Sequence, residues 1–342
     1  MLVLGDLACP NVQCAKELKS CMEKSGLFKN KVVLCNLEGM IRDDEPYSDE
    51  KLFNHSEVLR AFESSKTVFS IANNHTYDYP TFIENTENLL KKKGFFVNGA
   101  IIDEDIQPTI IKEGEVVYAI FTHCWRVYTK TNPNQVNDKR INDCSYETFF
   151  ETVKHYIDNN IDNKVVCFFH WNYDMETIPF PAYRKLARDL IDIGVYAVFG
   201  NHSHVPQGAE FYKERVIVYG LGNFYIPSGC FFDGKLTYPE TSKKMLVVEL
   251  QTENDAVLFH WFKTDVEEAL TLEKTETQYD CATLMKYSPY ARMDEKEYLK
   301  FFKRNRVKKT LVPVFRDYKG NIYDLKECAA ITRIKIVKLI KG

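Results

Sequence analysis

The chain has 342 residues, and 45 Lys and Arg residues against 48 Asp and Glu residues give it a formal net charge of −3. Apolar residues make up 45% of the chain and charged residues 27%, which is typical of soluble globular proteins and excludes a disordered, collagen-like or coiled-coil protein. No run approaches the roughly 18 consecutive apolar residues of a membrane-spanning helix.

The N-terminus reads MLVLGD, without the basic start and the longer apolar stretch of a secretory signal peptide. The ten cysteines include no Cys-x-x-Cys pair, and several lie in apolar runs, which is typical of reduced, buried thiols. If the chain begins at Met1, these features predict a cytoplasmic protein.

Short apolar runs alternate with helical patterns, which indicates an α/β fold. The predicted buried strands are residues 1–4, 31–35, 67–72, 164–169 and 195–199. Apolar residues at three-to-four spacing, with Pro at helix starts and Gly after helix ends, predict helices over residues 12–25, 80–93, 145–160 and 181–193. Antiparallel hairpins are expected over residues 108–121, 209–219 and 244–262. The pattern predicts two packed sheets flanked by helices.

The C-terminal part of the chain differs in charge from the rest. Residues 282–342 contain 16 Lys and Arg against 6 Asp and Glu, so the remainder of the chain carries −13. We therefore expect a main domain over residues 1–270 and a basic, partly helical extension over residues 271–342. Residues 331–341 form an amphipathic pattern with lysines opposite an apolar stripe.

This basic extension has three interpretations. It can be a solvated face, a docking surface for an anionic polymer or a synthase partner, or a contact with an anionic membrane surface. Charge alone also permits nucleic acid, but no motif for specific nucleic-acid recognition accompanies it.

Polar residues of metal-binding types follow each of the five predicted strands. They are Asp6, Glu38, Asn74, His75, His170, His202 and His204. The carboxyl ends of parallel strands meet at one edge of an α/β sheet, where ligands bind. Carboxylate, amide and imidazole ligands without thiolate suit Mn, Fe, Zn or Mg. His202 and His204 are two apart, so in an extended segment both rings would point to the same side.

These residues, in this order, resemble the CapA family of bacterial capsule and poly-γ-glutamate synthesis proteins, a branch of the calcineurin-like metallophosphoesterases. The resemblance covers roughly residues 1–260. It rests on Gly5-Asp6, Asn36-Leu37-Glu38, Ala72-Asn73-Asn74-His75 with Asp78, His170-Trp171, and the segments 200–207 and 219–224.

The resemblance implies a four-layer α/β/β/α sandwich of the metallophosphoesterase type and a site for two divalent metal ions, here Mn, Fe or Zn. The implied metal ligands are Asp6 and His204 on the first metal, Glu38 between the two, and Asn74, His170 and His202 on the second. His75 matches the general acid of the family, and Asp78 would orient it through a hydrogen bond.

The sequence departs from the family pattern at two positions. Ala8 occupies the place of a histidine in the superfamily's Asp-x-His start. Asp174 stands where the family often has a glutamate, and it has a shorter reach. These departures put full phosphatase activity in question.

Five residues are candidates for substrate binding, and one of them is Asp174. His123 and Arg126 follow a predicted strand and could reach the mouth of the site, with Arg126 as an anion clamp, although a surface loop is an equal alternative. Arg42 follows the Glu38 turn. Asn223 lies in a tight turn that we expect to support the site more than to bind metal.

The function expected from these features is a metal-dependent hydrolase of capsule or surface-polymer metabolism, cleaving a phosphoester or a γ-glutamyl amide in an anionic polymer or a small phosphoester. The alternative is a non-catalytic accessory protein that binds an anionic polymer and assists a synthase.

Overall fold

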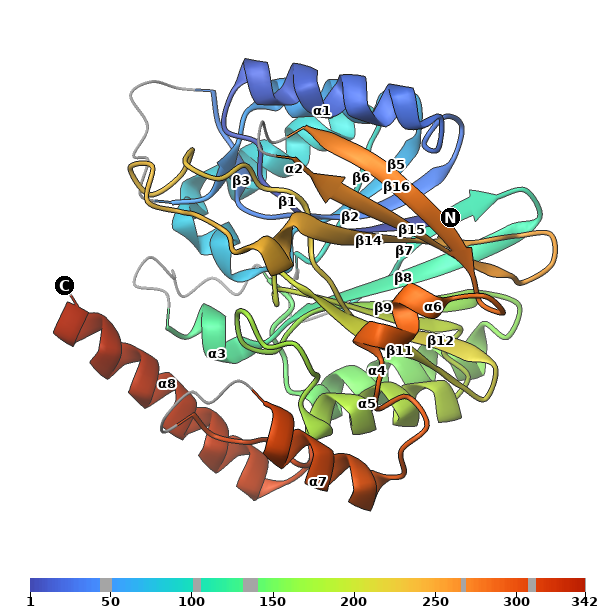
Figure 1. The fold of residues 1–342 in the computed structure, drawn as a ribbon, viewed down its shortest axis with the longest axis vertical. Helices are drawn as coiled ribbons and strands as arrows, with labels where there is room; N and C mark the ends of the chain where they lie inside the picture. The colour runs from blue at the N-terminus through green and yellow to red at the C-terminus, as the bar shows by residue number, and fades with distance from the viewer. Residues whose placement is uncertain (44–50, 101–105, 132–140, 266–268, 307–311, 342) are drawn as a thin grey trace.

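Two large β-sheets lie face to face at the centre of the molecule (Figure 1). The computed structural model describes residues 1–43, 51–100, 106–131, 141–265, 269–306 and 312–341. Within these residues a third, two-stranded sheet joins β3 and β4, which span Met40–Ile41 and Phe53–Asn54.

The first sheet has eight strands in the order β16-β15-β14-β1-β2-β5-β6, with β13 paired to the end of β1. Its strands β1, β2, β5 and β6 are parallel, and β14, β15 and β16 add an antiparallel half. The bounds are Leu2–Leu7 (β1), Val32–Leu37 (β2), Lys66–Ser70 (β5), Phe96–Asn98 (β6), Asn223–Tyr225 (β13), Lys244–Leu250 (β14), Val257–Thr264 (β15) and Leu270–Thr277 (β16).

The second sheet has six strands in the order β11-β12-β10-β9-β8-β7. Strands β8, β9, β10 and β12 are parallel, and β7 and β11 pair antiparallel at the two edges. The bounds are Thr109–Glu113 (β7), Val116–Cys124 (β8), Lys164–His170 (β9), Ala197–Asn201 (β10), Pro206–Tyr212 (β11) and Arg215–Leu221 (β12).

Alternating side chains along each central strand contribute to two different cores. In β9, Val166 and Phe168 face the first sheet, whereas Val165, Cys167 and Phe169 face the outer helices. Successive side chains of a strand point to opposite faces, so a strand covered on both faces reads as a continuous apolar run. This is why these strands could be found in the sequence.

Helices cover the outer face of each sheet. On the first sheet lie α1 (Val12–Ser25), η1 (Ser56–Phe62), η3 (Pro80–Phe82) and α2 (Ile83–Lys92), and on the second lie α4 (Tyr146–Asn159) and α5 (Pro181–Asp192). Local chemistry sets their ends: the Asn11 side chain accepts a hydrogen bond from the Cys14 amide, and Gly26 ends α1 with a φ of 66°. The α/β fold with two packed sheets flanked by helices, as predicted from the sequence, is therefore confirmed.

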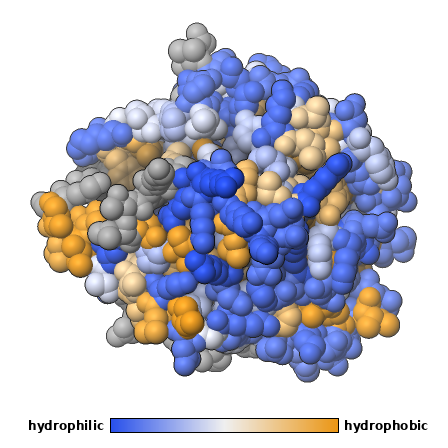
Figure 2. Space-filling view, turned by 60° about the horizontal axis from the view of Figure 1, so that its bottom comes forward, coloured by the Kyte–Doolittle hydropathy of each residue, from blue (hydrophilic) through white to orange (hydrophobic). Residues whose placement is uncertain are grey.

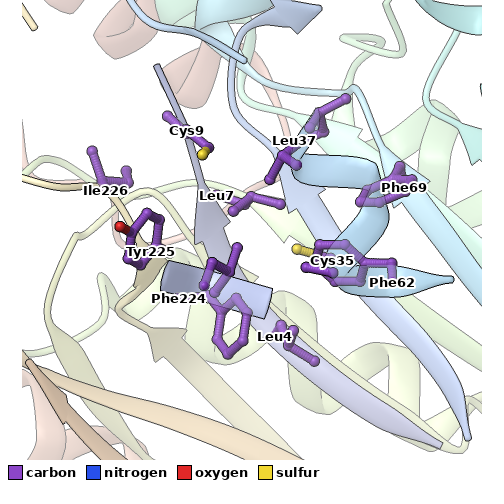
Figure 3. Close-up of a cluster of buried hydrophobic side chains, with 14 of the residues drawn as sticks. Leu4, Leu7, Cys9, Cys35, Leu37, Phe62, Phe69, Phe224, Tyr225 and Ile226 are labelled. Carbon is purple, nitrogen blue, oxygen red and sulfur yellow. The ribbon is translucent and has the colours of Figure 1, made fainter. Parts of the chain in front are cut away.

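Figure 3 shows part of the apolar core between the first sheet and its helices. Leu4, Leu7, Cys35 and Leu37 come from β1 and β2, and Phe62 of η1 packs edge-on against Phe69 of β5, with 5.1 Å between the ring centroids. This core lies directly behind the strand ends that carry the candidate ligands, so it fixes their positions.

The C-terminal segment packs against the helices of the second sheet (Figure 1). It contains α6 (Ala282–Tyr287), α7 (Glu295–Asn305) and α8 (Asn321–Lys341). Strand β16 already continues the first sheet beyond residue 270, and the side chains of Tyr298, Phe302, Phe315 and Tyr323 are buried in the outer core. Residues of the C-terminal segment thus contribute both to the first sheet and to the outer core.

The remaining short helices lie near the strand ends: η2 (Asn74–Asp78), α3 (Arg126–Thr129) and η4 (Glu240–Lys243). Among the described helices, none combines the length and the apolar character that a membrane crossing requires.

Candidate metal centre

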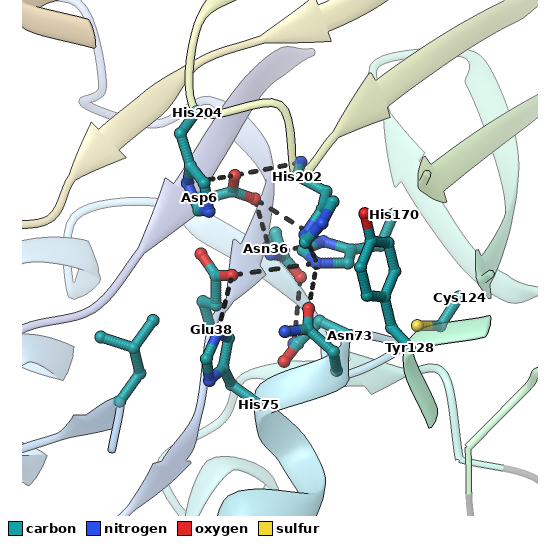
Figure 4. Close-up of polar contacts among 12 residues, drawn as sticks. Asp6, Asn36, Glu38, Asn73, His75, Cys124, Tyr128, His170, His202 and His204 are labelled. Carbon is teal, nitrogen blue, oxygen red and sulfur yellow. Dashed lines mark hydrogen bonds and ion pairs between the residues drawn. The ribbon is translucent and has the colours of Figure 1, made fainter. Parts of the chain in front are cut away.

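All six predicted metal ligands come together at the carboxyl ends of the central strands (Figure 4). Asp6 is in β1, His170 ends β9, and Asn74 opens η2 after β5. Glu38 follows β2, and His202 and His204 follow β10. Because the two sheets face each other, ligands from both reach one cluster.

Glu38 is the most informative member of the cluster. Its side chain is completely buried, and neither carboxylate oxygen has a hydrogen-bond partner among the described residues. An unpaired polar group in such a position costs free energy unless a cation compensates it. Ligand atoms of Glu38, His202 and His204 all lie within 4.8 Å of one another, which suits a single metal ion.

The imidazoles surround the two buried carboxylates. His170 Nε2 lies 3.8 Å from Glu38 Oε1, 2.6 Å from Asn74 Oδ1 and 2.8 Å from His202 Nδ1. His204 Nδ1 lies 3.5 Å from Asp6 Oδ2. Nitrogen and oxygen atoms of this kind converge on a common point when they coordinate the same ion.

The electrostatics of the cluster also fit a divalent metal. Burial raises the pKa of both Asp6 and Glu38, and the Asp6 carboxylate raises that of Glu38 further. Burial lowers the pKa of His170 and His204, which favours the neutral rings that keep a lone pair for a ligand bond. Bound cations would therefore stabilise the charged carboxylates.

The backbone presents His202 and His204 differently from the extended segment that the sequence suggested. Their φ angles are 84° and 54°, in the left-handed region that non-glycine residues rarely occupy. The His202 amide donates a hydrogen bond to Asp6 Oδ2, at 3.1 Å, which helps to hold this turn. Both rings still reach the cluster, with 5.6 Å between their centroids. Strain of this kind is often found where a site requires it.

Two asparagines that the sequence analysis did not single out as site residues hold the cluster in place through hydrogen bonds. Asn36 Nδ2 donates to Asp6 Oδ1 at 2.8 Å and lies 3.3 Å from His170 Nδ1. Asn73 Nδ2 donates to Asn36 Oδ1 and to the Leu37 carbonyl oxygen. Asn36 lies in β2, just before Glu38, and Asn73 follows β5, just before Asn74, so their position in the sequence was the available signal.

His75 and Asp78 form the pair expected for a general acid. His75 Nδ1 lies 2.6 Å from Asp78 Oδ2, and the other ring nitrogen, Nε2, is 3.9 Å from Glu38 Oε1. The Asn73 side chain caps η2, the short helix that carries both residues. His75 therefore points its free nitrogen toward the cluster (Figure 4).

Asp174 and Asn223 each contact one of the ligand histidines. Asp174 Oδ1 lies 2.7 Å from His202 Nε2, close enough for an ion pair although the two groups are not aligned for a hydrogen bond. Asn223 Oδ1 lies 2.7 Å from His204 Nδ1. Asn223 thus orients His204, as expected for a supporting residue.

The structure corrects the expected positions of His123 and Arg126. His123 is buried in the outer core, where Nε2 contacts the Cys144 carbonyl oxygen and burial lowers its pKa to about 4. Arg126 forms ion pairs with Glu327 and Asp324 of α8. His123 faces the helices because side chains alternate along β8, and Arg126 is engaged by a segment distant in sequence.

Arg42 also lies away from the metal ligands. Its guanidinium group packs over the ring of Tyr79, 4.2 Å from the ring centroid, and over that of Phe82 at 5.1 Å. A residue that the sequence did not indicate, Tyr128 of α3, instead lies against a ligand, with 4.0 Å between its ring centroid and that of His202.

A cavity of about 650 Å³ opens onto the cluster. Its base includes Asn74, His75, His202 and His204, and its walls include side chains from the loop 232–239 and from α8. Ligand pockets are commonly about 300–1,000 Å³. The cluster of candidate ligands is therefore accessible to a small molecule or to one end of a polymer.

The sequence matches the family "Bacterial capsule synthesis protein PGA_cap" over residues 13–228. The chain belongs to this family. The matched region contains Glu38, Asn74, His75 and the three ligand histidines, whereas Asp6 lies before it and the C-terminal helices lie after it.

Two curated relatives have related names. The capsule biosynthesis protein CapA of Bacillus anthracis is 26% identical over 223 residues, which are 62% of this chain and 52% of the relative. The PGA biosynthesis protein CapA of Bacillus subtilis is 38% identical over 60 residues, 18% of this chain and 16% of the relative. The matched part of this chain thus spans about half the length of the first relative and less of the second.

Solved structures with a detectable likeness include the calcineurin-like phosphoesterase YfkN from Bacillus subtilis, with 12% identity, a TM-score of 0.39 and coverage of 87% of this chain and 98% of that one. A 5'-nucleotidase structure from Staphylococcus aureus, described as putative, has 10% identity, a TM-score of 0.44 and coverage of 84% and 58%.

Proposed function

We propose that the protein is a metal-dependent hydrolase that acts in the synthesis or processing of a capsule or another anionic surface polymer. The observation that carries this proposal is the buried Glu38 carboxylate, which accepts no hydrogen bond from the described residues and lies beside imidazoles and the His75–Asp78 pair. Membership of a capsule synthesis family supports the biological setting.

The proposed metal ligands are those that meet at the strand ends: Asp6, Glu38, Asn74, His170, His202 and His204. Divalent ions at such a site supply Lewis acidity and lower the pKa of bound water toward neutrality. Asn36, Asn73 and Asn223 hold the ligand side chains in place through hydrogen bonds.

His75 is the proposed proton donor. Asp78 accepts a hydrogen bond from Nδ1, which fixes the orientation of the ring. Nε2 faces the cluster and would deliver its proton to the leaving oxygen or nitrogen atom of the substrate. This role requires that the leaving group lies on the His75 side of Glu38.

The substrate proposed for this site is a phosphoester or a γ-glutamyl amide. Both reactions place negative charge on an oxygen at the reacting centre and release a group that must be protonated. The test is hydrolysis of bis(p-nitrophenyl) phosphate and of γ-glutamyl p-nitroanilide by manganese-loaded protein. We expect turnover of one of them that EDTA abolishes and added Mn²⁺ restores. No turnover of either would contradict the proposal.

A second candidate function is non-catalytic binding of an anionic polymer in support of a synthase. One observation favours it: Ala8, where the superfamily has a histidine, is buried and offers no ligand atom from its side chain. Metal-dependent polymer binding without turnover would support this function over hydrolysis.

A further inference from the structure

Part of the wall of the cavity comes from segments of the chain outside the matched family region. The base of the cavity belongs to residues 13–228, but Tyr238 of the loop 232–239, and Arg333 and Lys338 of α8, also line it. Some of the residues that would surround a substrate therefore lie C-terminal to the matched region.

Helix α8 is held firmly in its place beside the cavity. Arg126, next to the ligand-contacting α3 residue Tyr128, forms ion pairs with Glu327 and Asp324, and Trp125 Nε1 donates to Glu327 Oε1 at 3.1 Å. Tyr323 and Ala330 of α8 are buried in the outer core. These contacts fix which side of the helix faces the cavity.

The cavity side of α8 is cationic. Arg333 is half-buried and forms no hydrogen bond or ion pair with any residue that the structure describes. Lys338 donates one hydrogen bond, at 2.9 Å, to the Thr131 carbonyl oxygen, and an ammonium group has three donors. Lys51 lines the cavity as well, with its Nζ 2.9 Å from the Asp78 carbonyl oxygen.

A second surface of α8 is apolar and exposed. Ile336, Leu339 and Ile340 are exposed, and Figure 2 shows hydrophobic surface at the left margin of an otherwise mostly hydrophilic face, on the side where α8 ends in Figure 1. Nothing in the structure indicates what would cover this surface, whereas the cationic side faces a defined cavity.

We propose that Arg333 and Lys338 bind anionic groups of the substrate next to the reacting group, so that α8 selects a polyanionic chain over a small ester. This inference rests on the proposed function, because it takes the metal cluster as the place of reaction. A cation that keeps unused hydrogen-bond donors beside a cavity is a natural site for a carboxylate or a phosphate. The shared chemistry is a series of closely spaced negative charges.

The test compares Arg333→Gln and Lys338→Gln with a matched control, Lys335→Gln, which removes the same charge from an exposed position of the same helix that does not line the cavity. Calorimetry on manganese-loaded protein would measure binding of a γ-glutamate oligomer and of tripolyphosphate, which separate a carboxylate from a phosphate preference. We expect each cavity variant to weaken binding of the preferred polyanion about tenfold, and Lys338→Arg to retain most of the affinity.

Binding and turnover separate the two proposals. If the wild-type protein binds a polyanion through Arg333 and Lys338 but hydrolyses no substrate, the hydrolase proposal fails. The proposal that these two residues bind anionic groups is then supported. If turnover occurs but both cavity variants bind the polyanions as tightly as the wild type, the proposed anion binding by Arg333 and Lys338 is refuted. Equal losses in Lys335→Gln, or no binding of either polyanion by the wild-type protein, would also refute it. Thermal melting of each variant checks that the fold is intact.

Discussion

Phe315 provides a direct test of whether the C-terminal segment belongs to the core. Its side chain is fully buried, and its ring packs against those of Trp125 and Tyr323 with centroid separations of 5.2 and 5.1 Å. Its carbonyl oxygen accepts a hydrogen bond from the Ala182 amide at the start of α5. Phe315→Ala would leave a cavity between α5 and α8, the helix that carries Arg333 and Lys338.

The expected loss for Phe315→Ala is about 3–5 kcal/mol in the free energy of unfolding. An unfolding entropy of about 2.1 cal/mol/K per residue gives about 0.7 kcal/mol/K for this chain, so the melting temperature should fall by roughly 4–7 °C. Differential scanning calorimetry measures this shift. The control is Leu339→Ala, which removes an apolar side chain that is 83% exposed and should change melting by less than about 1 °C.

A Phe315→Ala protein that melts within about 1 °C of the wild type would refute this reasoning. It would mean that residues after 282 are attached to the domain without contributing to its stability, as a separate extension would be. The fall in melting temperature should also be accompanied by weaker polyanion binding, because the same packing holds α8 beside the cavity.

Three further predictions concern the site and its surroundings. Protein purified without chelator should contain at least one equivalent of Mn, Fe or Zn by elemental analysis. EDTA should lower its melting temperature, because a metal that binds only the folded state stabilises that state. No metal uptake at micromolar concentrations would contradict the proposed metal site. The His75→Ala variant should keep its metal but lose turnover about 10²–10⁴-fold. The control His155→Ala, at an exposed position of α4, should lose neither metal nor turnover. Equal loss of metal and activity would indicate that His75 is a metal ligand. The hydrogen bond with His260 lowers the pKa of Glu249 to about 2, from 4.5, so this carboxylate should contribute about 3 kcal/mol of stability above pH 4.5 that is lost as the pH falls toward 2. Glu249→Gln should therefore be less stable than the wild type at pH 7 and nearly equal to it near pH 2, as measured by urea unfolding; an equal difference at both pH values would contradict this linkage.

The sequence by itself indicated the main helices and strands and the candidate ligands. The predicted helix over 12–25 is α1, and the strand predicted over 164–169 is β9, which ends at His170. Caps, glycines and apolar periodicity act over a few residues, so they can be read locally. Because parallel strands must align their carboxyl ends, the polar residues after each strand were expected to meet, and the six ligands do.

Only the tertiary structure decided the positions that depend on distant partners. Arg126 follows a strand and could have faced the cavity, but Glu327 and Asp324, about two hundred residues later, engage it. Likewise, net charge indicated a basic C-terminal segment, yet only packing against the second sheet's helices brings Arg333 to the metal cavity. Long-range ion pairs and aromatic contacts leave no local periodicity, and that is why they could not be read from the sequence.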